Sequence, residues 1–256
     1  SSAAVSKPTF IDIEDASWMW GILITDKDRV STTGICNFPS HMGSLNYGYA
    51  SVGGWRRISP KLYNQIPESD VRKGWFLDDT GVSVNLPAAA QAYITKKGAP
   101  VYTQVKYGPM NDEWGSNNNA TDVILMRVEE MYLIKAEAQA MNNDVSGGVN
   151  TLNSFVNTYR DPSYKCTATT GEAVQEAVWH QRRIEFWGEG LAYFDIMRLN
   201  KGVNRLGCGF PKTAVFNIAA GDPVQIYSIP NKEVQYNPLL ENNPLVSAPT
   251  PIPDEE

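Results

Sequence analysis

Two pairs of glutamates are the first candidates for catalysis in this sequence. Hydrolysis of a glycosidic bond needs two carboxyl groups at a set separation. Glu129 and Glu130 are adjacent, and Glu189 follows Glu185 by four residues. On a helix, adjacent side chains point about 100° apart, so Glu129 and Glu130 do not converge on one substrate atom. A solvated or ion-paired helix face is therefore the better interpretation of these carboxylates.

Arginines and acidic residues are spaced for ion pairs between residues 181 and 198. Glu185 lies three residues after Arg182. Arg198 likewise lies three residues after Asp195, so both pairs are neighbours on a helix surface. The stretch also carries aromatic residues such as Trp187, which indicates that it is half buried. Arginines in such places bind carboxylates or carbonyls in a bidentate manner. We predict a structural clamp, rather than a ligand contact, formed by Arg127, Arg182, Arg183, Glu185, Glu189, Asp195 and Arg198.

Aromatic side chains in sequence rich in Gly, Ser and Asn are candidates for ligand binding. Exposed Trp and Tyr side chains offer flat, rigid contact area with a polar group. A sugar ring presents an apolar C–H face and a rim of hydroxyls, so such side chains are suited to it. We predict glycan-binding candidates at Trp18, Tyr47, Tyr49 and Trp55; the alternative is that these rings pack beneath the loops. Trp20, inside the apolar run MWGILIT, is expected to pack into the core.

Signatures of metal or cofactor chemistry are missing from the sequence. It contains no G-x-S-x-G, no H-E-x-x-H, no G-x-G-x-x-G after a strand and no Walker motif. Cys36, Cys166 and Cys208 form no C-x-x-C pair, and an odd number leaves at least one thiol free. His41 and His180, the two histidines, are far apart. The sequence therefore predicts no metal site, no cofactor and no disulfide scaffold.

The composition is that of an ordinary globular protein. The 256 residues are 42% hydrophobic and 20% charged, which argues against disorder, collagen and coiled coil. No run of about 18 apolar residues occurs, so nothing in the sequence spans a membrane. The net charge of −6 disfavours a nucleic-acid binder, whose surface would be basic, although a local basic patch is left open.

The chain begins SSAAVSKPTF, without a positively charged n-region, an apolar h-region or a cysteine for lipidation. Either the protein never had a signal sequence or the chain is an internal fragment, and composition alone leaves both open.

The elements that must position these residues divide the chain into unlike segments. Residues 1–120 carry five of the seven tryptophans and are predicted to be loop-rich, with short strands such as 19–25 and 101–105. Residues 121–246 are predicted to be helical, and 247–256 to be a mobile, acidic, proline-rich tail. We expect one compact unit.

Helical periodicity dominates the second segment. It predicts helices over 121–142, 149–159 and 171–199, the last interrupted at Gly188 and Gly190. A strand is expected at 225–229 and a turn or short helix at 233–236. The small residues Ala136, Ala138 and Ala140 would let a partner helix approach closely. Such pairs occur in α-solenoid repeats, although one pair does not prove a repeat.

Two stretches of the chain resemble motifs of one known family. ILMRVEEMYLIKAEAQA (124–140) is similar to the SusD/RagB pattern R-x-x-E-x-x-L-x-x-A-E-A. QRRIEFWGEGLAYFDIMR (181–198) is similar to that family's E-R-R-x-E-L-x-x-E-G-x-R-x-x-D-x-x-R. The resemblance covers about 18–245, the C-terminal half of such proteins, so we expect a fragment of a longer protein. Gln181 stands where a glutamate is usual and Ala192 where an arginine is usual, which puts one ion pair of the clamp in doubt.

The resemblance implies both a fold and a function. The fold is mainly α, a tetratricopeptide-like helical scaffold with a large irregular segment and a few short strands. The function is noncatalytic: a glycan-binding lipoprotein, lipid-anchored in the outer membrane and exposed on the surface of a Bacteroidetes cell. Its partners would be a glycan and a SusC-like TonB-dependent transporter, with no cofactor and no nucleic acid. On this resemblance we expect the lipid anchor to belong to the full-length protein and to be absent from this chain.

Two other functions are left open by the sequence. The chain could be a protein-interaction scaffold that docks a transporter without itself contacting sugar. It could also be a hydrolase, which would need a carboxyl group of raised pKa near a second carboxylate.

Overall fold

A computed structural model describes residues 1–28 and 37–254 and divides the chain into two compact units, Ser1–Glu189 and Gly190–Glu256. Cys36 lies outside the described residues. The predicted segments 1–120 and 121–246 follow sequence composition, whereas the boundary between the units falls after Glu189. The physical reason is that a strand and ion pairs, described below, join residues 123–189 to the irregular segment before them.

The irregular part of the first unit is built from short helices and loops around two apolar clusters. Its helices are α1 (Ser2–Val5), α2 (Phe38–Met42), α3 (Pro60–Tyr63) and α4 (Ala88–Lys96), with 3-10 turns at Val71–Trp75 and Met110–Asp112. Helix α2 begins where the Asn37 side chain accepts from the Ser40 N–H (2.7 Å), followed by a proline in the first turn. One cluster surrounds the fully buried Trp75 and Phe76, and the other surrounds Leu45 and Ile94.

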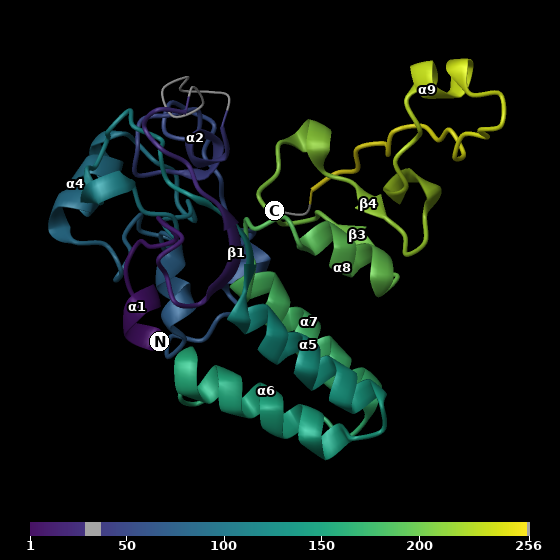
Figure 1. Cartoon of the computed structure of the whole chain (residues 1–256), viewed down its shortest axis with the longest axis horizontal. Helices are drawn as coiled ribbons and strands as arrows, with labels where there is room; N and C mark the ends of the chain where they lie inside the picture. Colours follow the sequence, from purple (N-terminus) through teal and green to yellow (C-terminus); the bar gives the residue numbers. More distant parts are fainter. Residues whose placement is uncertain (29–36, 255–256) are drawn as a thin grey trace. The chain divides into compact units, whose positions relative to one another are not determined.

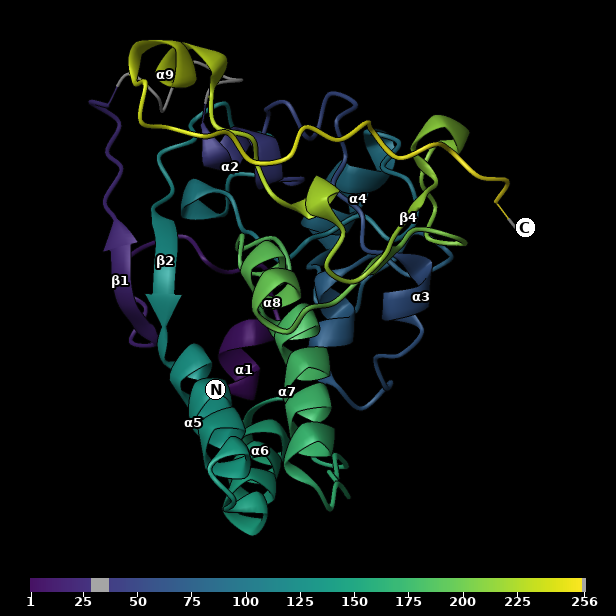
Figure 2. The ribbon, with the colours of Figure 1, turned by 90° about the vertical axis from the view of Figure 1, so that its right-hand side faces the viewer.

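A two-stranded antiparallel ribbon links the two sequence segments (Figure 2). Strand β1 (Trp18–Ile22) pairs with β2 (Val123–Arg127). The strand predicted near 19–25 is present, but the helix predicted from residue 121 begins only at Val128, because the β-capable run 123–127 finds a partner strand. The ribbon also corrects the expectation for Trp20, which is 63% exposed. Its register shifts on both sides of Trp20, and such bulges re-aim side chains.

The other two predicted strands do not form ladders in the described chain. Residues 101–105 make isolated bridges, of Thr103 with Arg57 and of Gln104 with Phe76. Of residues 225–229, Gln225 ends the 3-10 turn Pro223–Gln225, and residues 226–229 are irregular.

Three longer helices, α5 (Val128–Met141), α6 (Val145–Tyr159) and α7 (Gly171–Glu185), lie side by side at one end of the first unit (Figure 1). Asp144 caps α6 by accepting from the Gly147 N–H at 2.9 Å, and Thr170 caps α7. The helices predicted over 149–159 and from 171 are thus confirmed. The buried side chains between them are Leu133, Ala136, Ala140, Leu152, Phe155, Val156, Val174 and Val178.

The close helix approach expected from the alanines occurs at α6. A Cβ atom added to Gly148 would lie 2.7 Å from the Ala136 carbonyl oxygen and 2.9 Å from the Ala140 Cβ. We expect Gly148→Ala to lower the free energy of unfolding by about 1–3 kcal/mol, because α5 and α6 must separate. Urea unfolding checks this, with Asn150→Ala on the exposed face of α6 as the control. Equal stability of the two variants would contradict the packing described.

The second unit holds shorter elements. They are α8 (Ala192–Arg198), β3 (Val203–Asn204), β4 (Asn217–Ile218) and α9 (Asn231–Tyr236), with 3-10 turns at Lys212–Ala214 and Pro223–Gln225. Strands β3 and β4 pair antiparallel. In the C-terminal tail, the Ile252 N–H donates to the Val215 carbonyl (2.9 Å). The predicted short helix at 233–236 is present as part of α9.

The predicted fold class, mainly α with a few short strands, is confirmed. Within residues 1–28 and 37–254, none of the helices is both long and apolar enough to cross a membrane.

Candidate functional site

Two of the predicted aromatic residues, Tyr47 and Tyr49, lie exposed on the loop that follows α2. Their exposed fractions are 48% and 44%. The Tyr47 N–H donates to the carbonyl oxygen of Ser116 (2.8 Å), and the Tyr49 N–H donates to Oγ of Ser40 (2.9 Å). The backbone beneath both rings is therefore held in place by segments from elsewhere in the first unit.

Basic side chains lie against these rings. The His41 ring stacks on Tyr49 with centroids 4.8 Å apart, and the Arg56 guanidinium lies 5.7 Å from the Tyr49 centroid. The Lys97 ammonium lies 5.6 Å from the centroid of Tyr47. Sequence reasoning missed these three basic residues, because local spacing does not show which cation will lie over which ring. We call these five side chains the tyrosine surface.

The two predicted tryptophans are placed differently. Trp18, on β1, is partly buried and packs against the cluster around Trp75. Trp55 is also partly buried and packs against the cluster around Leu45. The structure thus places Tyr47 and Tyr49 exposed on one loop, whereas Trp18 and Trp55 pack against the core.

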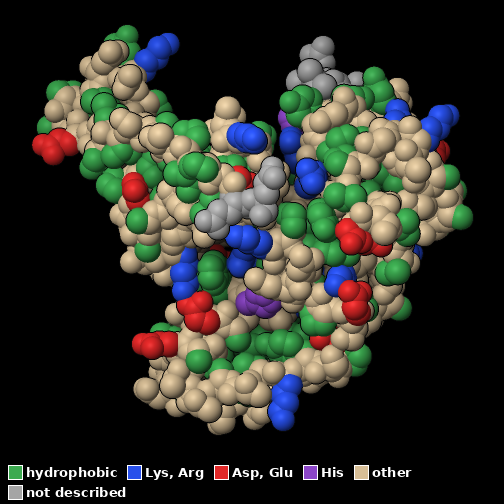
Figure 3. Space-filling model, turned by 180° about the vertical axis from the view of Figure 1, so that it is seen from behind, with side chains coloured by type: hydrophobic (Ala, Val, Ile, Leu, Met, Phe, Trp, Pro, Cys, Tyr) green, Lys and Arg blue, Asp and Glu red, His purple; other side chains and the backbone are tan. Residues whose placement is uncertain are grey.

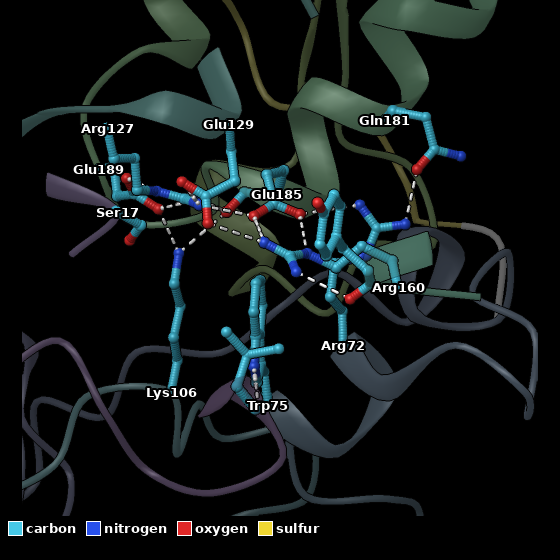
Figure 4. Close-up of polar contacts among 12 residues, drawn as sticks. Ser17, Arg72, Trp75, Lys106, Arg127, Glu129, Arg160, Gln181, Glu185 and Glu189 are labelled. Atoms are coloured by element: carbon cyan, nitrogen blue, oxygen red, sulfur yellow. Dashed lines mark hydrogen bonds and ion pairs between the residues drawn. The ribbon is translucent and has the colours of Figure 1, made fainter. Parts of the chain in front are cut away.

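A buried ion network occupies the interior of the first unit, centred on Glu185 (Figure 4). Its carboxylate is fully buried and accepts hydrogen bonds from three arginines. Arg127 donates through Nη1 (2.6 Å) and Arg72 through Nη1 (3.1 Å). Arg160 donates through Nε and Nη2, both at 2.8 Å. These arginines come from β2, the 3-10 turn Val71–Trp75 and the end of α6, so one carboxylate joins three elements to α7.

Glu189 forms the second centre of the network. It accepts from Nε of Arg127 (2.9 Å) and from the ammonium of Lys106. Lys106 also donates to the backbone carbonyls of Glu185 and Trp187, each at 3.0 Å. The Glu185 carbonyl belongs to the last turn of α7 and the Trp187 carbonyl lies just beyond it, where carbonyl groups lack partners within the helix. Lys106 therefore satisfies the end of α7 as well as the Glu189 charge.

Gln181 lies where the family pattern has a glutamate, and its position shows what the change does. Arg72 donates through Nη2 to the Gln181 Oε1 at 2.6 Å. The charge of Arg72 is met by Asp70, at 2.5 Å, and by Glu185. The contact between Arg72 and position 181 is thus kept as a hydrogen bond to a neutral group, and Asp70 and Glu185 still balance the charge of Arg72.

The other predicted clamp residues lie outside this centre. Arg182 pairs with Glu130 at 3.1 Å, and the Arg183 guanidinium lies 5.1 Å from the Trp179 ring centroid. In the second unit, Arg198 pairs with Asp195 at 2.8 Å, as their spacing predicts.

The network contains members that sequence reasoning did not assign to the clamp. They are Asp70, Arg72, Lys106, Glu129 and Arg160; Glu129 accepts from Arg160 at 3.0 Å. The signal available in the sequence was weak, because these residues lie on separate segments.

The carboxylates at the centre are held ionised. Burial by itself would raise the pKa of Glu185, but Arg160 and Arg127 hold it well below its usual value. The pKa of Glu189 is also lowered, since Arg127 and Lys106 outweigh burial. Hydrolysis of a glycosidic bond needs a carboxylic acid that keeps its proton near neutral pH. Glu185 and Glu189 are therefore arranged to hold the structure together rather than to donate protons.

No cluster of three or more His, Cys, Asp or Glu side chains suited to a metal ion occurs among the described residues. Of the described cysteines, Cys166 and Cys208 are free thiols.

On the face shown in Figure 3, side chains of both charge signs lie among hydrophobic ones.

Comparison with known proteins gives consistent results. The profile of the SusD family matches residues 67–245. A SusD-like carbohydrate binding protein from Bacteroides vulgatus is 26% identical, with a TM-score of 0.58, over 80% of this chain and 38% of that one. A SusD superfamily protein from Bacteroides thetaiotaomicron is 23% identical, with a TM-score of 0.66, over 90% of this chain and 49% of that one.

A further SusD superfamily protein, from Bacteroides vulgatus, is 21% identical, with a TM-score of 0.64, over 89% of this chain and 46% of that one. The chain thus spans less than half the length of each of these structures. Among proteins with curated descriptions, none matches this sequence.

Proposed function

The chain belongs to the SusD family, and from this premise we propose that it binds oligosaccharide or polysaccharide without catalysing a reaction. The resemblance inferred from the two motifs is thereby confirmed. The proposal is supported by the similarity to a solved SusD-like carbohydrate binding protein and by the tyrosine surface. The observation that carries it is the exposure of Tyr47 and Tyr49 beside basic hydrogen-bond donors.

The tyrosine surface suits a saccharide for physical reasons. The exposed part of each ring offers apolar area for the C–H side of a pyranose, beside the basic side chain that already lies against the ring. Arg56 and Lys97 lie beside the rings and can donate hydrogen bonds to hydroxyl oxygens. The ordered backbone beneath the rings limits the entropy lost when a ligand binds.

Replacing both Tyr47 and Tyr49 by alanine is expected to weaken glycan binding about tenfold to hundredfold, because the exposed apolar area of two rings is lost. A panel of neutral oligosaccharides, titrated by isothermal calorimetry, measures this. Tyr236→Ala is the matched control, since Tyr236 is 86% exposed in the second unit and should leave the affinity unchanged.

The same panel should be run on a longer form that covers the full length of the relatives. Binding by the longer form alone would reject the tyrosine surface as the site and place it outside this chain. An unchanged affinity of the double variant would reject it as well.

The remaining parts of the proposal concern the whole protein. We propose that it is anchored by a lipid at the outer membrane, exposed on the cell surface, and delivers glycan to a SusC-like TonB-dependent transporter. Family membership and the similarity to proteins from Bacteroides support this.

A second candidate function is a scaffold that docks the transporter without itself contacting sugar. The observation that favours it is the exposed apolar surface of the β1–β2 ribbon. Met19, Trp20 and Leu125 are 55%, 63% and 41% exposed, and exposed apolar groups of this kind mark interaction surfaces.

A further inference from the structure

A cavity of about 530 Å³ opens within the first unit, and no side chain of the tyrosine surface lines it. Its volume falls in the range of small-molecule binding sites. We call it the Tyr63 pocket. Its aromatic wall is formed by Tyr63, Phe76 and Tyr102. Its carboxylates are those of Glu68, Asp70, Asp78 and Asp79, of which Asp70 is paired with Arg72.

The aromatic wall is held by a strained backbone. The Tyr63 and Tyr102 rings lie 5.1 Å apart between centroids. Tyr102 has a φ of +64°, a left-handed conformation that is unfavourable for a residue with a Cβ atom. Hydrogen bonds hold it: its N–H donates to Leu77 (3.1 Å) and its carbonyl accepts from Ile58 (3.0 Å). Backbone outliers of this kind gather at ligand sites.

The charge of the pocket is negative. The Glu68 carboxylate is paired with Lys73, whereas Asp78 and Asp79 form no ion pair with any residue that the structure describes. Burial would raise the pKa of Asp78, but hydrogen bonds from Val82 and Thr80 lower it, so this carboxylate stays ionised. Burial, followed by the charges of Asp78, Glu68 and Asp79, raises the pKa of Tyr63 to about 12.

Lys73 indicates which chemical group the pocket accepts. Its ammonium lies 5.1 Å from the Tyr63 ring centroid and pairs with Glu68. An ammonium group between an aromatic face and a carboxylate gains from both the ring quadrupole and the opposite charge. Asp78 and Asp79 add two further carboxylates to the same lining.

We propose that the Tyr63 pocket binds an amino sugar, a saccharide unit that carries a protonated amine. The amine pairs with Asp78 and Asp79, the C–H face of the ring packs on Tyr102, and Asn64 hydrogen-bonds a hydroxyl. The assignment rests on the proposed glycan-binding function and adds a second site to it. The negative lining repels uronic acids and sulfated sugars.

The test compares two ligands of the same skeleton by isothermal calorimetry. One is the disaccharide of β-1,4-linked glucosamine with free amines, and the other is its N,N′-diacetyl form. The free-amine form is expected to bind at least about tenfold more tightly, and its advantage should shrink as ionic strength rises from about 0.01 to about 1 M.

Variants locate the binding. Asp79→Asn, at an exposed position, should remove most of the advantage of the free amine and leave the acetylated form unchanged. Tyr102→Gly removes the ring while suiting the positive φ, and should weaken the free-amine form about tenfold. Glu113→Gln is the control, because its exposed carboxylate does not line the pocket.

Equal binding of both disaccharides would overturn the proposal, as would a free-amine advantage that survives Asp79→Asn. The two functions fail separately. If neutral glycans bind and lose affinity in the Tyr47/Tyr49 variant while the free-amine disaccharide does not bind, the Tyr63 pocket is rejected and the proposed function stands.

Discussion

Glu185→Gln is expected to lower the free energy of unfolding by about 3–5 kcal/mol, the cost of removing one partner from a buried ion network. Glu185 is fully buried and faces Arg72, Arg127 and Arg160. The amide keeps the shape but loses the charge, so three buried guanidinium groups share one carboxylate fewer. A loss of this size is a large fraction of the total free energy of unfolding of a typical domain.

Urea unfolding followed by circular dichroism measures this effect. Glu172→Gln, in the exposed first turn of α7, is the matched control and should change stability by no more than about 1 kcal/mol. If Glu185→Gln does not fold, Glu130→Gln gives a graded measurement, because it breaks the outer pair with Arg182 alone. A stability of Glu185→Gln within about 1 kcal/mol of the parent would refute the clamp role.

Acid is expected to unfold the protein for the same reason. In the folded state the pKa of Glu185 lies well below its usual 4.5, and that of Glu189 is also lowered. Below about pH 4.5 the unfolded chain therefore binds more protons than the folded one. Stability gained by both groups is present above that pH and is lost as pH falls through the folded pKa values.

The size of the effect follows from proton counting. Each group contributes a slope of about 1.36 kcal/mol per pH unit where only the unfolded state is protonated, so the two groups together contribute about 2.7 kcal/mol per pH unit. Free energies of unfolding from urea titrations between about pH 5 and 3 give the slope. Glu189→Gln should reduce the slope by the contribution of one group. A free energy of unfolding that does not change with pH in the parent would contradict the direction of both pKa shifts.

The helices and the clamp motifs were readable from the sequence because their signals are local. The spacing of apolar residues predicted α6 and α7. The small side chains near Ala136 predicted that another helix approaches α5 closely, as α6 does at Gly148. The strand at 123–127 was not readable, since the same apolar run fits a helix and only the partner β1 decides.

Partners in the ion network could not be predicted for a related reason. Arg72 and Glu185 are 113 residues apart, and Lys106 and Glu189 are 83 apart. The local spacing around either residue does not indicate which distant residue is its partner. The aromatic residues show the same limit: Trp18 packs on the core and Trp20 is exposed, although they are two residues apart on one strand. A bulge between them, rather than composition, sets this difference.

The long spans of the ion network also bear on how the chain folds and how long it stays folded. Arg160 and Glu185 are 25 residues apart and Arg127 and Glu185 are 58 apart, but Arg72 closes a loop of 113. Loop closure must precede such contacts, so the helical part can form before the turn at Val71–Trp75 docks. Contacts made after the transition state slow unfolding rather than speed folding. The Arg72–Glu185 contact is therefore expected to slow unfolding more than it speeds folding.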